Sequence, residues 1–216
     1  MNASYWDDFE EHQQDEYPIS DFVKELADRT RAAFQEIDDD YFPAYLGLDN
    51  SVKIYSLIRN KKPEKVVETG VCNGMSSAVI LKALKDNGKG RLYSVDLPVE
   101  AGTIEDRKGA VIPPGKTSGW LVTQEMKDIW DLYLGDTYYE LPKVMEKVRE
   151  IDIFLHDSDH SYETMMFEFG MAWHHLRSDG VILADNTDKN DAFKDFARAK
   201  HCKLYRMNEL ALIIKS

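Results

Sequence analysis

From Lys65 onward, short apolar segments alternate with segments of helical spacing, and this alternation constrains the fold more than any other feature of the sequence. The expected strands are "KVVET", "RLYSVD", "WDLYLGD", "IDIFLHD" and "GVILADN". The helices expected between them are "GMSSAVILKALKDNG", "WLVTQEMKD", "YYELPKVMEKVRE" and "SYETMMFEFGMAWHHL". Strands that are apolar on both faces and joined by helical crossovers predict an α/β fold with a mostly parallel sheet.

The C-terminal end departs from this alternation. The strand-like segments "CKLYRMN" and "LALIIKS" follow each other almost directly, so no crossover helix fits between them. We expect an antiparallel hairpin on the edge of the sheet, which brings the sheet to seven strands.

The chain begins with the acidic segment "MNASYWDDFEEHQQDEYP", followed by two expected helices. Ser20 and Asp21 are candidate caps of the first helix, and the second is expected from about Asn50 to just before Pro63. We therefore expect an N-terminal helical extension over residues 1–62, on the substrate side, and a ligand-binding domain over residues 63–216.

The composition excludes several classes of protein. With 43% hydrophobic residues in a chain of 216, one globular domain with a full core is expected rather than a disordered chain. The formal charge of −12 disfavours binding to nucleic acid and to anionic membrane surfaces. Only Cys72 and Cys202 occur, and neither a signal segment nor an apolar run of about 20 residues is visible, so we expect a cytoplasmic protein.

The turn after the first strand, "ETGVCNG", is the strongest local signal for a ligand. Ligands of open α/β sheets bind beyond the carboxyl ends of the strands, and Gly70 and Gly74 allow the backbone to approach a ligand closely. A dinucleotide site needs G-x-G-x-x-G, whereas this turn has G-x-x-x-G with the carboxylate of Glu68 before it. A cationic ligand is therefore favoured over a phosphate, and the alternative is a tight turn that binds nothing.

The pattern E-x-G-x-x-x-G resembles the S-adenosylmethionine site of class I methyltransferases. This resemblance implies a Rossmann-like, doubly wound fold over about residues 65–216. Asp96 ends the second strand, where a carboxylate can accept hydrogen bonds from both ribose hydroxyls. Asp136 ends the third strand, and the resemblance implies that it lies near the adenine. The predicted cofactor-binding residues are Glu68, Thr69, Gly70, Cys72, Asn73, Gly74, Ser76, Asp96, Gly135, Asp136 and Asp157.

Further oxygen ligands follow the fourth and fifth strands, in "HDSDH" and "ADN". Such ligands suit a hard divalent cation such as Mg²⁺. The sequence here resembles the metal-dependent O-methyltransferases of the catechol and caffeoyl-CoA type, and this resemblance implies that Asp157, Asp185 and Asn186 are the metal ligands. The family has a lysine as general base three residues after the first metal aspartate, where this chain has His160. The alternative is that these residues only cap helices, which we favour for Asp159.

The predicted function is methylation of a small-molecule hydroxyl by S-adenosylmethionine, assisted by a divalent metal, with His160 and Asp157 as catalytic residues. The segment over residues 97–119 is a candidate lid. Two alternatives stay open, a non-catalytic S-adenosylmethionine-binding protein and a nicotinamide-dependent oxidoreductase. Exposed apolar faces on the N-terminal helices are compatible with a homodimer.

Overall fold

The computed structural model describes residues 19–216 except 36, 38–42, 45, 102–109 and 208. The acidic segment over residues 1–18 and the middle of the candidate lid therefore lie outside the described residues.

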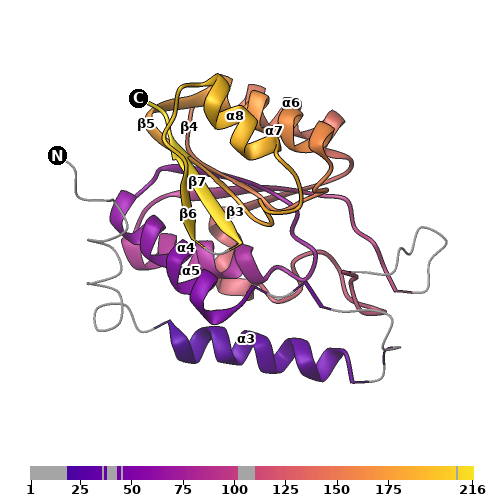
Figure 1. The fold of residues 1–216 in the computed structure, drawn as a ribbon. Helices are drawn as coiled ribbons and strands as arrows, with labels where there is room; N and C mark the ends of the chain where they lie inside the picture. The colour runs from indigo at the N-terminus through magenta and orange to yellow at the C-terminus, as the bar shows by residue number, and fades with distance from the viewer. Residues whose placement is uncertain (1–18, 36, 38–42, 45, 102–109, 208) are drawn as a thin grey trace.

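Seven strands form one mixed sheet, as the sequence predicts (Figure 1). The strands are β1 (Lys65–Thr69), β2 (Arg91–Asp96), β3 (Trp130–Leu134), β4 (Ile151–His156), β5 (Leu176–Ala184), β6 (Tyr205–Met207) and β7 (Leu210–Ile214). Their order is β3-β2-β1-β4-β5-β7-β6. The first five are parallel, and β7 pairs antiparallel with both β5 and β6. The predicted C-terminal hairpin is confirmed.

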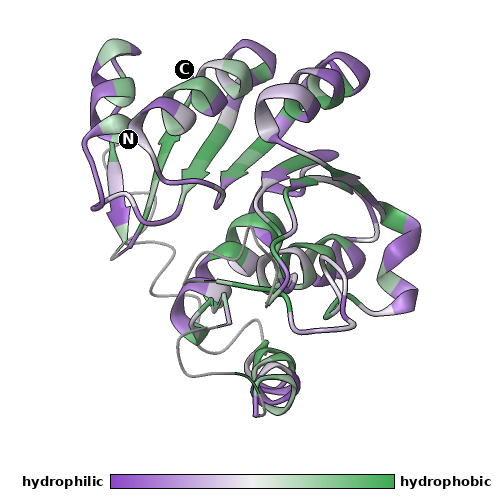
Figure 2. Ribbon diagram, turned by 90° about the vertical axis from the view of Figure 1, so that its right-hand side faces the viewer, coloured by the Kyte–Doolittle hydropathy of each residue, from purple (hydrophilic) through white to green (hydrophobic). Residues whose placement is uncertain are grey.

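Helices cover both faces of the sheet (Figure 1). The helices are α3 (Ser20–Ala33), α4 (Leu48–Lys61), α5 (Met75–Asn87), α6 (Thr137–Val148), α7 (Tyr162–His175) and α8 (Ala192–Ala199). α6, α7 and α8 lie on one face, and α4 and α5 lie on the other with α3 outside them. Figure 2 shows the apolar strands between helices whose polar sides face outward. This is the Rossmann-like α/β arrangement predicted from the strand and helix alternation.

Two local predictions and one alternative reading differ from the structure. "WLVTQEMKD" is expected to be a crossover helix, but only the 3₁₀ helix Gln124–Ile129 forms there. Just before it, Gly119 N and Leu121 N donate to Cys72 O and Asn73 O of the glycine turn. α3 begins at Ser20 with Ile19 at its N-cap, so the Ser20 side chain caps nothing. The alternative reading of Asn186 as a helix cap does not hold, because α8 begins after Asp191.

The two faces of the sheet are packed by separate apolar clusters. One joins the strands to α4, α5 and α3, with Leu26, Ile54 and Leu81 all fully buried in it. The other joins them to α6, α7 and α8, with Phe154 and Phe169 at its centre. The N-terminal helices thus share a core with the sheet.

The strand register brings the functional turns together. Thr69, the last residue of β1, pairs with both Val95 of β2 and His156 of β4, and His156 pairs with Ala184 of β5. Four parallel strands therefore end at one level, on either side of the point where the strand order reverses between β1 and β4. In open α/β sheets that crevice is where ligands bind.

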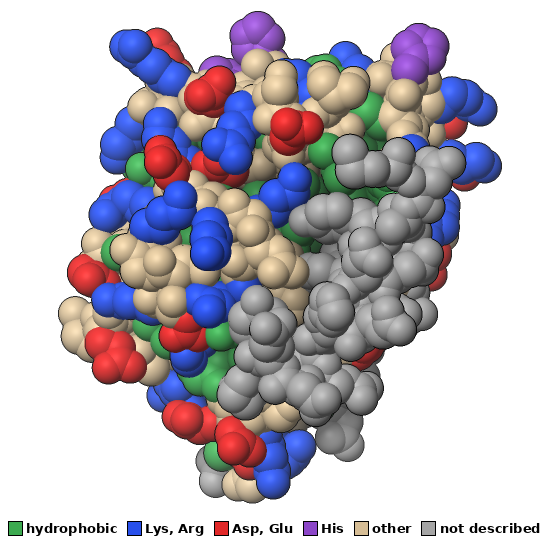
Figure 3. Space-filling model, turned by 90° about the vertical axis from the view of Figure 1, so that its left-hand side faces the viewer, with side chains coloured by type: hydrophobic (Ala, Val, Ile, Leu, Met, Phe, Trp, Pro, Cys, Tyr) green, Lys and Arg blue, Asp and Glu red, His purple; other side chains and the backbone are tan. Residues whose placement is uncertain are grey.

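The surface in Figure 3 carries Lys and Arg together with Asp and Glu rather than charges of one sign. Over the described residues, no helix is both long and apolar enough to cross a membrane.

Candidate active site

A pocket of about 690 Å³ opens at the carboxyl edge of β1, β4 and β5. This volume is in the range of small-molecule sites. Most of its lining comes from the turns that follow these three strands. The lining residues are Gly70, Val71, Cys72, Met75 and Ser76 after β1, Asp157, Ser158, Asp159 and His160 after β4, Asp185, Asn186 and Lys189 after β5, and Ala44, Leu46, Ala110 and Glu209.

The turn after β1 depends on its two predicted glycines. Gly70 has φ +82°, and a Cβ there would lie 1.9 Å from the carbonyl oxygen of Asp157. Gly74 has φ +89°, and a Cβ there would lie 2.6 Å from Cα of Gly119. Each glycine thus permits a left-handed backbone and a close backbone contact at once. Gly70 sets the turn directly against the loop after β4.

Glu68 is fully buried beneath the turn and does not line the pocket. Its carboxylate accepts hydrogen bonds from Ser76 Oγ at 2.6 Å, Ser77 Oγ at 2.6 Å and Ser94 Oγ at 2.8 Å. Burial raises the pKa of this carboxyl, and the three serine hydroxyls oppose that shift. Glu68 therefore joins β1 to the start of α5 and to β2, and the contact to a cofactor stays a prediction.

Asp96, the last residue of β2, accepts hydrogen bonds from the turn after β1. Its Oδ1 accepts from the backbone N–H groups of Val71 at 2.8 Å and Cys72 at 3.2 Å, and its Oδ2 accepts from the hydroxyl of Ser118. The carboxylate is almost fully buried and is adjacent to the pocket rather than part of its lining. A ribose hydroxyl at Asp96 would share the oxygen atoms that these donors use.

The middle of the turn is fixed by the segment over residues 110–122. Asn73 is buried; its side chain donates to Val111 O at 3.2 Å and accepts from Trp120 Nε1 at 2.6 Å. Arg29 of α3 and Lys116 lie over the indole of Trp120, 5.9 and 5.0 Å from its centroid. This part of the candidate lid is hence bonded to the turn that it was expected to cover.

Cys72 lines the pocket in a left-handed conformation, with φ 46°. Burial, together with the charge of Asp96, raises the pKa of its thiol to about 12. The thiol is therefore protonated at neutral pH, and Cys72 contributes its backbone and a small apolar surface rather than a nucleophile.

Gly135 and Asp136 follow β3, beyond the lining of the pocket. Asp136 is the N-cap of α6, and its Oδ1 accepts from the backbone N–H of Tyr138 at 2.8 Å. Gly135 N donates to Asp96 O at 2.8 Å, so the two strand ends are linked. The adenine contact of Asp136 stays a prediction.

The structure brings the three predicted metal ligands together in the pocket. Burial and the neighbouring carboxylates of Asp185 and Glu68 raise the pKa of Asp157 well above its usual range. Asn186 Nδ2 donates to Asp185 Oδ2 at 2.7 Å, and Asn186 has a left-handed φ of 52°. Asp185 Oδ1 is buried and finds no hydrogen-bond partner among the described residues.

These observations fit a divalent cation. Two adjacent carboxylates, one with an unpaired buried oxygen, are stabilised when a cation shares them. Over the described part of the chain, no group of three or more His, Cys, Asp or Glu side chains is arranged to hold a metal. The fit therefore depends on Asn186 as the third ligand.

His160 lines the pocket, and Asn186 Nδ2 lies 3.4 Å from its Nε2. Burial, followed by the nearby His156 and Lys189, lowers the pKa of His160 to about 4. Its backbone oxygen accepts from Asn190 Nδ2 at 2.8 Å. The imidazole is thus neutral at pH 7 and contacts Asn186 through Nε2, and its buried Nδ1 has no hydrogen-bond partner among the described residues.

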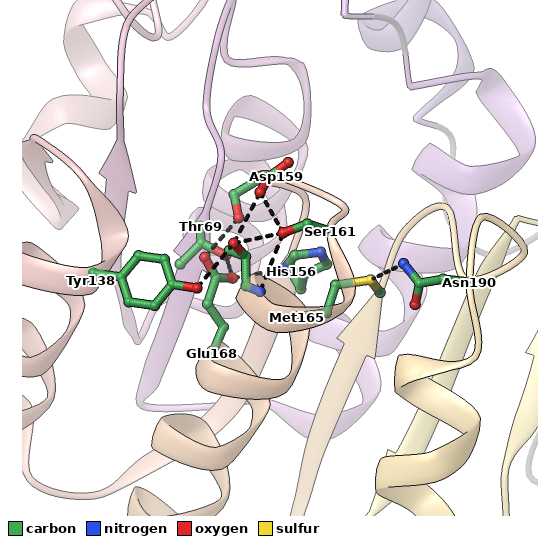
Figure 4. A network of polar contacts seen from close by, with 10 residues as sticks. Thr69, Tyr138, His156, Asp159, Ser161, Met165, Glu168 and Asn190 are labelled. Atoms are coloured by element: carbon green, nitrogen blue, oxygen red, sulfur yellow. Dashed lines mark hydrogen bonds and ion pairs between the residues drawn. The ribbon is translucent and has the colours of Figure 1, made fainter.

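Sequence reasoning missed a buried polar network beside the pocket (Figure 4). Glu168 of α7 accepts from Thr69 Oγ1 at 2.5 Å and Ser158 Oγ at 2.7 Å, and it lies 2.7 Å from His156 Nδ1. The available signal was an acid in the middle of the buried stripe of α7. That stripe is formed by Thr164, Met165, Glu168, Phe169 and Ala172.

The expectation that Asp159 caps α7 is wrong, because Ser161 is the N-cap of this helix. Asp159 Oδ2 instead accepts from Ser161 Oγ at 2.6 Å and from Thr164 Oγ1 at 2.9 Å, beside the cap. Lys189 and Glu209 were also not predicted, and both line the pocket. Nothing in their local sequence separates them from ordinary surface charges.

A family model described as "Methyltransferase domain" matches residues 67–187, which is more than half of the 216-residue chain. The chain belongs to the methyltransferase domain family. The match runs from β1 to the turn after β5 and so includes the three turns that form most of the pocket. The class I methyltransferase resemblance seen in the sequence is confirmed.

Solved structures share the fold of this methyltransferase at low sequence identity. An S-adenosylhomocysteine-bound methyltransferase from Podospora anserina, PaMTH1, is 14% identical with a TM-score of 0.64, and the match covers 100% of this chain and 97% of that one. The O-methyltransferase TomG of Streptomyces achromogenes, involved in tomaymycin synthesis and bound to S-adenosylmethionine, is 15% identical with a TM-score of 0.63, covering 89% and 90%.

An O-methyltransferase from Bacillus cereus, in complex with S-adenosylhomocysteine, is 13% identical with a TM-score of 0.58, covering 90% and 91%. No curated protein matches the chain.

Proposed function

We propose that this methyltransferase transfers the methyl group of S-adenosylmethionine to a hydroxyl oxygen of a small molecule, assisted by a divalent cation. The observation that carries the proposal is the pocket, in which the glycine turn after β1 faces Asp157, His160, Asp185 and Asn186. All three solved neighbours described above carry S-adenosylmethionine or S-adenosylhomocysteine, and two are O-methyltransferases.

In this proposal the cofactor lies along the turn from Gly70 to Ser76, beside Asp96. The sulfonium is already a good leaving group, so the protein has mainly to hold the hydroxyl in line with the methyl group and to exclude water. His160 is the proposed acceptor of the hydroxyl proton, because its ring lines the pocket beside Asn186.

Asp157, Asp185 and Asn186 would hold the cation, which when bound supplies positive charge that favours the ionised form of the acceptor hydroxyl. The metal is proposed as Mg²⁺, because all three side chains offer oxygen ligands. The pocket also contains Lys189 and Glu209, so a polar small molecule is the expected acceptor.

Calorimetric titration with S-adenosylmethionine tests the cofactor. Asp96→Asn should weaken binding at least tenfold, because an amide keeps the side-chain size but cannot accept from two ribose hydroxyls and its present donors together. Asp128→Asn, at an exposed acid of the 3₁₀ helix, is the matched control and should change nothing. Absence of binding by the native chain would refute the function, and equal affinities of the two variants would refute the role of Asp96.

The metal is tested separately. The native protein should bind Mn²⁺, monitored by the electron paramagnetic resonance signal of the free ion, and Asp185→Asn should weaken that binding by 10-fold or more while S-adenosylmethionine affinity is kept. Methyl transfer to a panel of hydroxyl acceptors should fall when a chelator is added. Unchanged transfer in chelator would refute metal assistance and leave the cofactor site standing.

A further inference from the structure

Glu168 lies where an apolar side chain is expected. It is 0% exposed and belongs to the face of α7 that packs on the sheet. Burying a carboxylate costs several kcal/mol unless hydrogen bonds compensate. The side chain does not cap α7, since Ser161 already does so by accepting from Thr164 N. Neither the packing nor the helix end accounts for an acid at this position.

The contacts of Glu168 connect two sides of the pocket. Thr69 is the last residue of β1 and directly precedes Gly70, whereas Ser158 lies in the loop after β4, between Asp157 and His160. His156, the last residue of β4, is the third partner, and its ring is also fully buried. Figure 4 shows Glu168 reaching from α7 toward the Thr69 and His156 side chains.

The two segments that Glu168 joins already touch. Asp157 N donates to Thr69 O at 2.9 Å, and Gly70 leaves no room for a Cβ beside the Asp157 carbonyl. A small displacement of the loop over residues 157–160 therefore also displaces the glycine turn. One carboxylate that accepts from both fixes their separation.

We propose that Glu168 is a positioning residue, which holds the loop over residues 157–160 against the glycine turn and so sets the shape of the pocket. The action is geometric: Glu168 touches neither cofactor nor acceptor but holds Thr69, His156 and Ser158 in place. Its effect on cofactor affinity rests on the proposed function, whereas its effect on the two segments does not.

Three variants test this. Glu168→Met keeps the side-chain length and removes every acceptor. Glu168→Gln keeps the shape, and its amide can contact the same three partners if Ser158 reverses its role from donor to acceptor. Ser161→Ala removes the N-cap of the same helix, at a cost of about 1 kcal/mol, without touching Glu168.

The first readout is amide hydrogen exchange of the full chain. Glu168→Met should raise exchange at least tenfold at residues 69–72 and 157–160, and Glu168→Gln should restore the slow rates. Ser161→Ala should affect the start of α7 and residues 159–160, because Ser161 Oγ donates to Asp159, and should leave residues 69–72 unchanged. The second readout is calorimetry with S-adenosylmethionine, where Glu168→Met should bind at least tenfold more weakly and Glu168→Gln within about threefold of the native chain.

Equal exchange in Glu168→Met and Ser161→Ala at residues 69–72 would overturn the proposal, as would a Glu168→Gln variant that behaves like Glu168→Met. If the native chain does not bind S-adenosylmethionine, the proposed function fails and the exchange comparison still decides the positioning role. If Glu168→Met does not fold, Thr69→Val removes one partner at equal volume and should speed exchange at residues 69–72 alone. Unaltered exchange there would overturn the proposal.

Discussion

Replacing Gly70 by alanine tests the contact on which the pocket geometry depends. Gly70 has φ +82°, where an L-residue loses roughly 1–2 kcal/mol relative to its ordinary conformations. The added methyl group would also lie 1.9 Å from the Asp157 carbonyl oxygen, 2.4 Å from its carbonyl carbon and 2.8 Å from Ser158 N. All three are backbone atoms, so no side-chain rotation relieves the clash.

The expected loss of folding stability in Gly70→Ala is obtained by comparison with alanine substitution at a second glycine, Gly88. Gly88 ends α5 with φ +67°, and a Cβ there meets nothing within 4 Å. Gly88→Ala therefore costs only the conformational strain, about 1–2 kcal/mol. Gly70→Ala costs the same strain plus overpacking of about 1–3 kcal/mol, because the loop after β4 must move by roughly 1 Å. Each extra kcal/mol lowers the melting temperature by about 2–4 °C in a chain of this size.

Urea titration of both variants, followed by circular dichroism, measures the two free energies of unfolding. Gly70→Ala should be the less stable by at least about 1 kcal/mol. It should also bind S-adenosylmethionine more weakly, since Gly70 begins the turn along which the cofactor is proposed to lie. Free energies of unfolding that agree within about 0.5 kcal/mol would refute the reasoning, because the contact with Asp157 would then impose no constraint.

Three further predictions concern stability, each measured by urea titration. Trp120→Phe should cost about 1–3 kcal/mol, because the buried Asn73 Oδ1 loses its 2.6 Å donor; a neutral result would contradict a role for this bond. Asp136→Ala should cost about 1 kcal/mol through loss of the α6 N-cap, and an unchanged midpoint would exclude that contribution. The Arg91 Nε–Asp131 Oδ2 contact of 2.5 Å lowers the pKa of Asp131 from its usual value. The small stability benefit over Asp131→Asn, at most about 1 kcal/mol for a partly exposed pair, should therefore be present at pH 7 and decrease as the pH falls below about 4; a benefit that is the same at pH 7 and pH 2 would refute it.

Much of the candidate site follows from the sequence because it depends on strand ends. Gly70, Asp157 and Asp185 each come directly after an apolar strand, and Asn186 follows Asp185; the carboxyl ends of neighbouring parallel strands lie at one edge of the sheet. Their meeting in one pocket could therefore be expected from the order of strands and helices. The same reasoning placed His160, three residues after Asp157.

The sequence was less informative about which hydrogen-bond donors a given carboxylate accepts from. Glu68, Asp96 and Asp136 were predicted to face a cofactor, and in the structure the first accepts from three serines, the second from two backbone amides and Ser118, and the third from the start of α6. A carboxylate accepts any nearby donor, and strand position does not say which donor is nearest.

By itself, then, the sequence determined the seven-stranded α/β fold, the C-terminal hairpin and the strand ends that carry the site. The reason is that the spacing of apolar residues within each segment indicates whether it forms a strand or a helix, and this spacing can be read locally. Only the tertiary structure decided that Glu168 ties β1 to the loop after β4, and that the segment over residues 110–122 is bonded to the glycine turn. Thr69 and Glu168 are 99 residues apart, and contacts at such separation depend on how the layers pack, which no local pattern encodes.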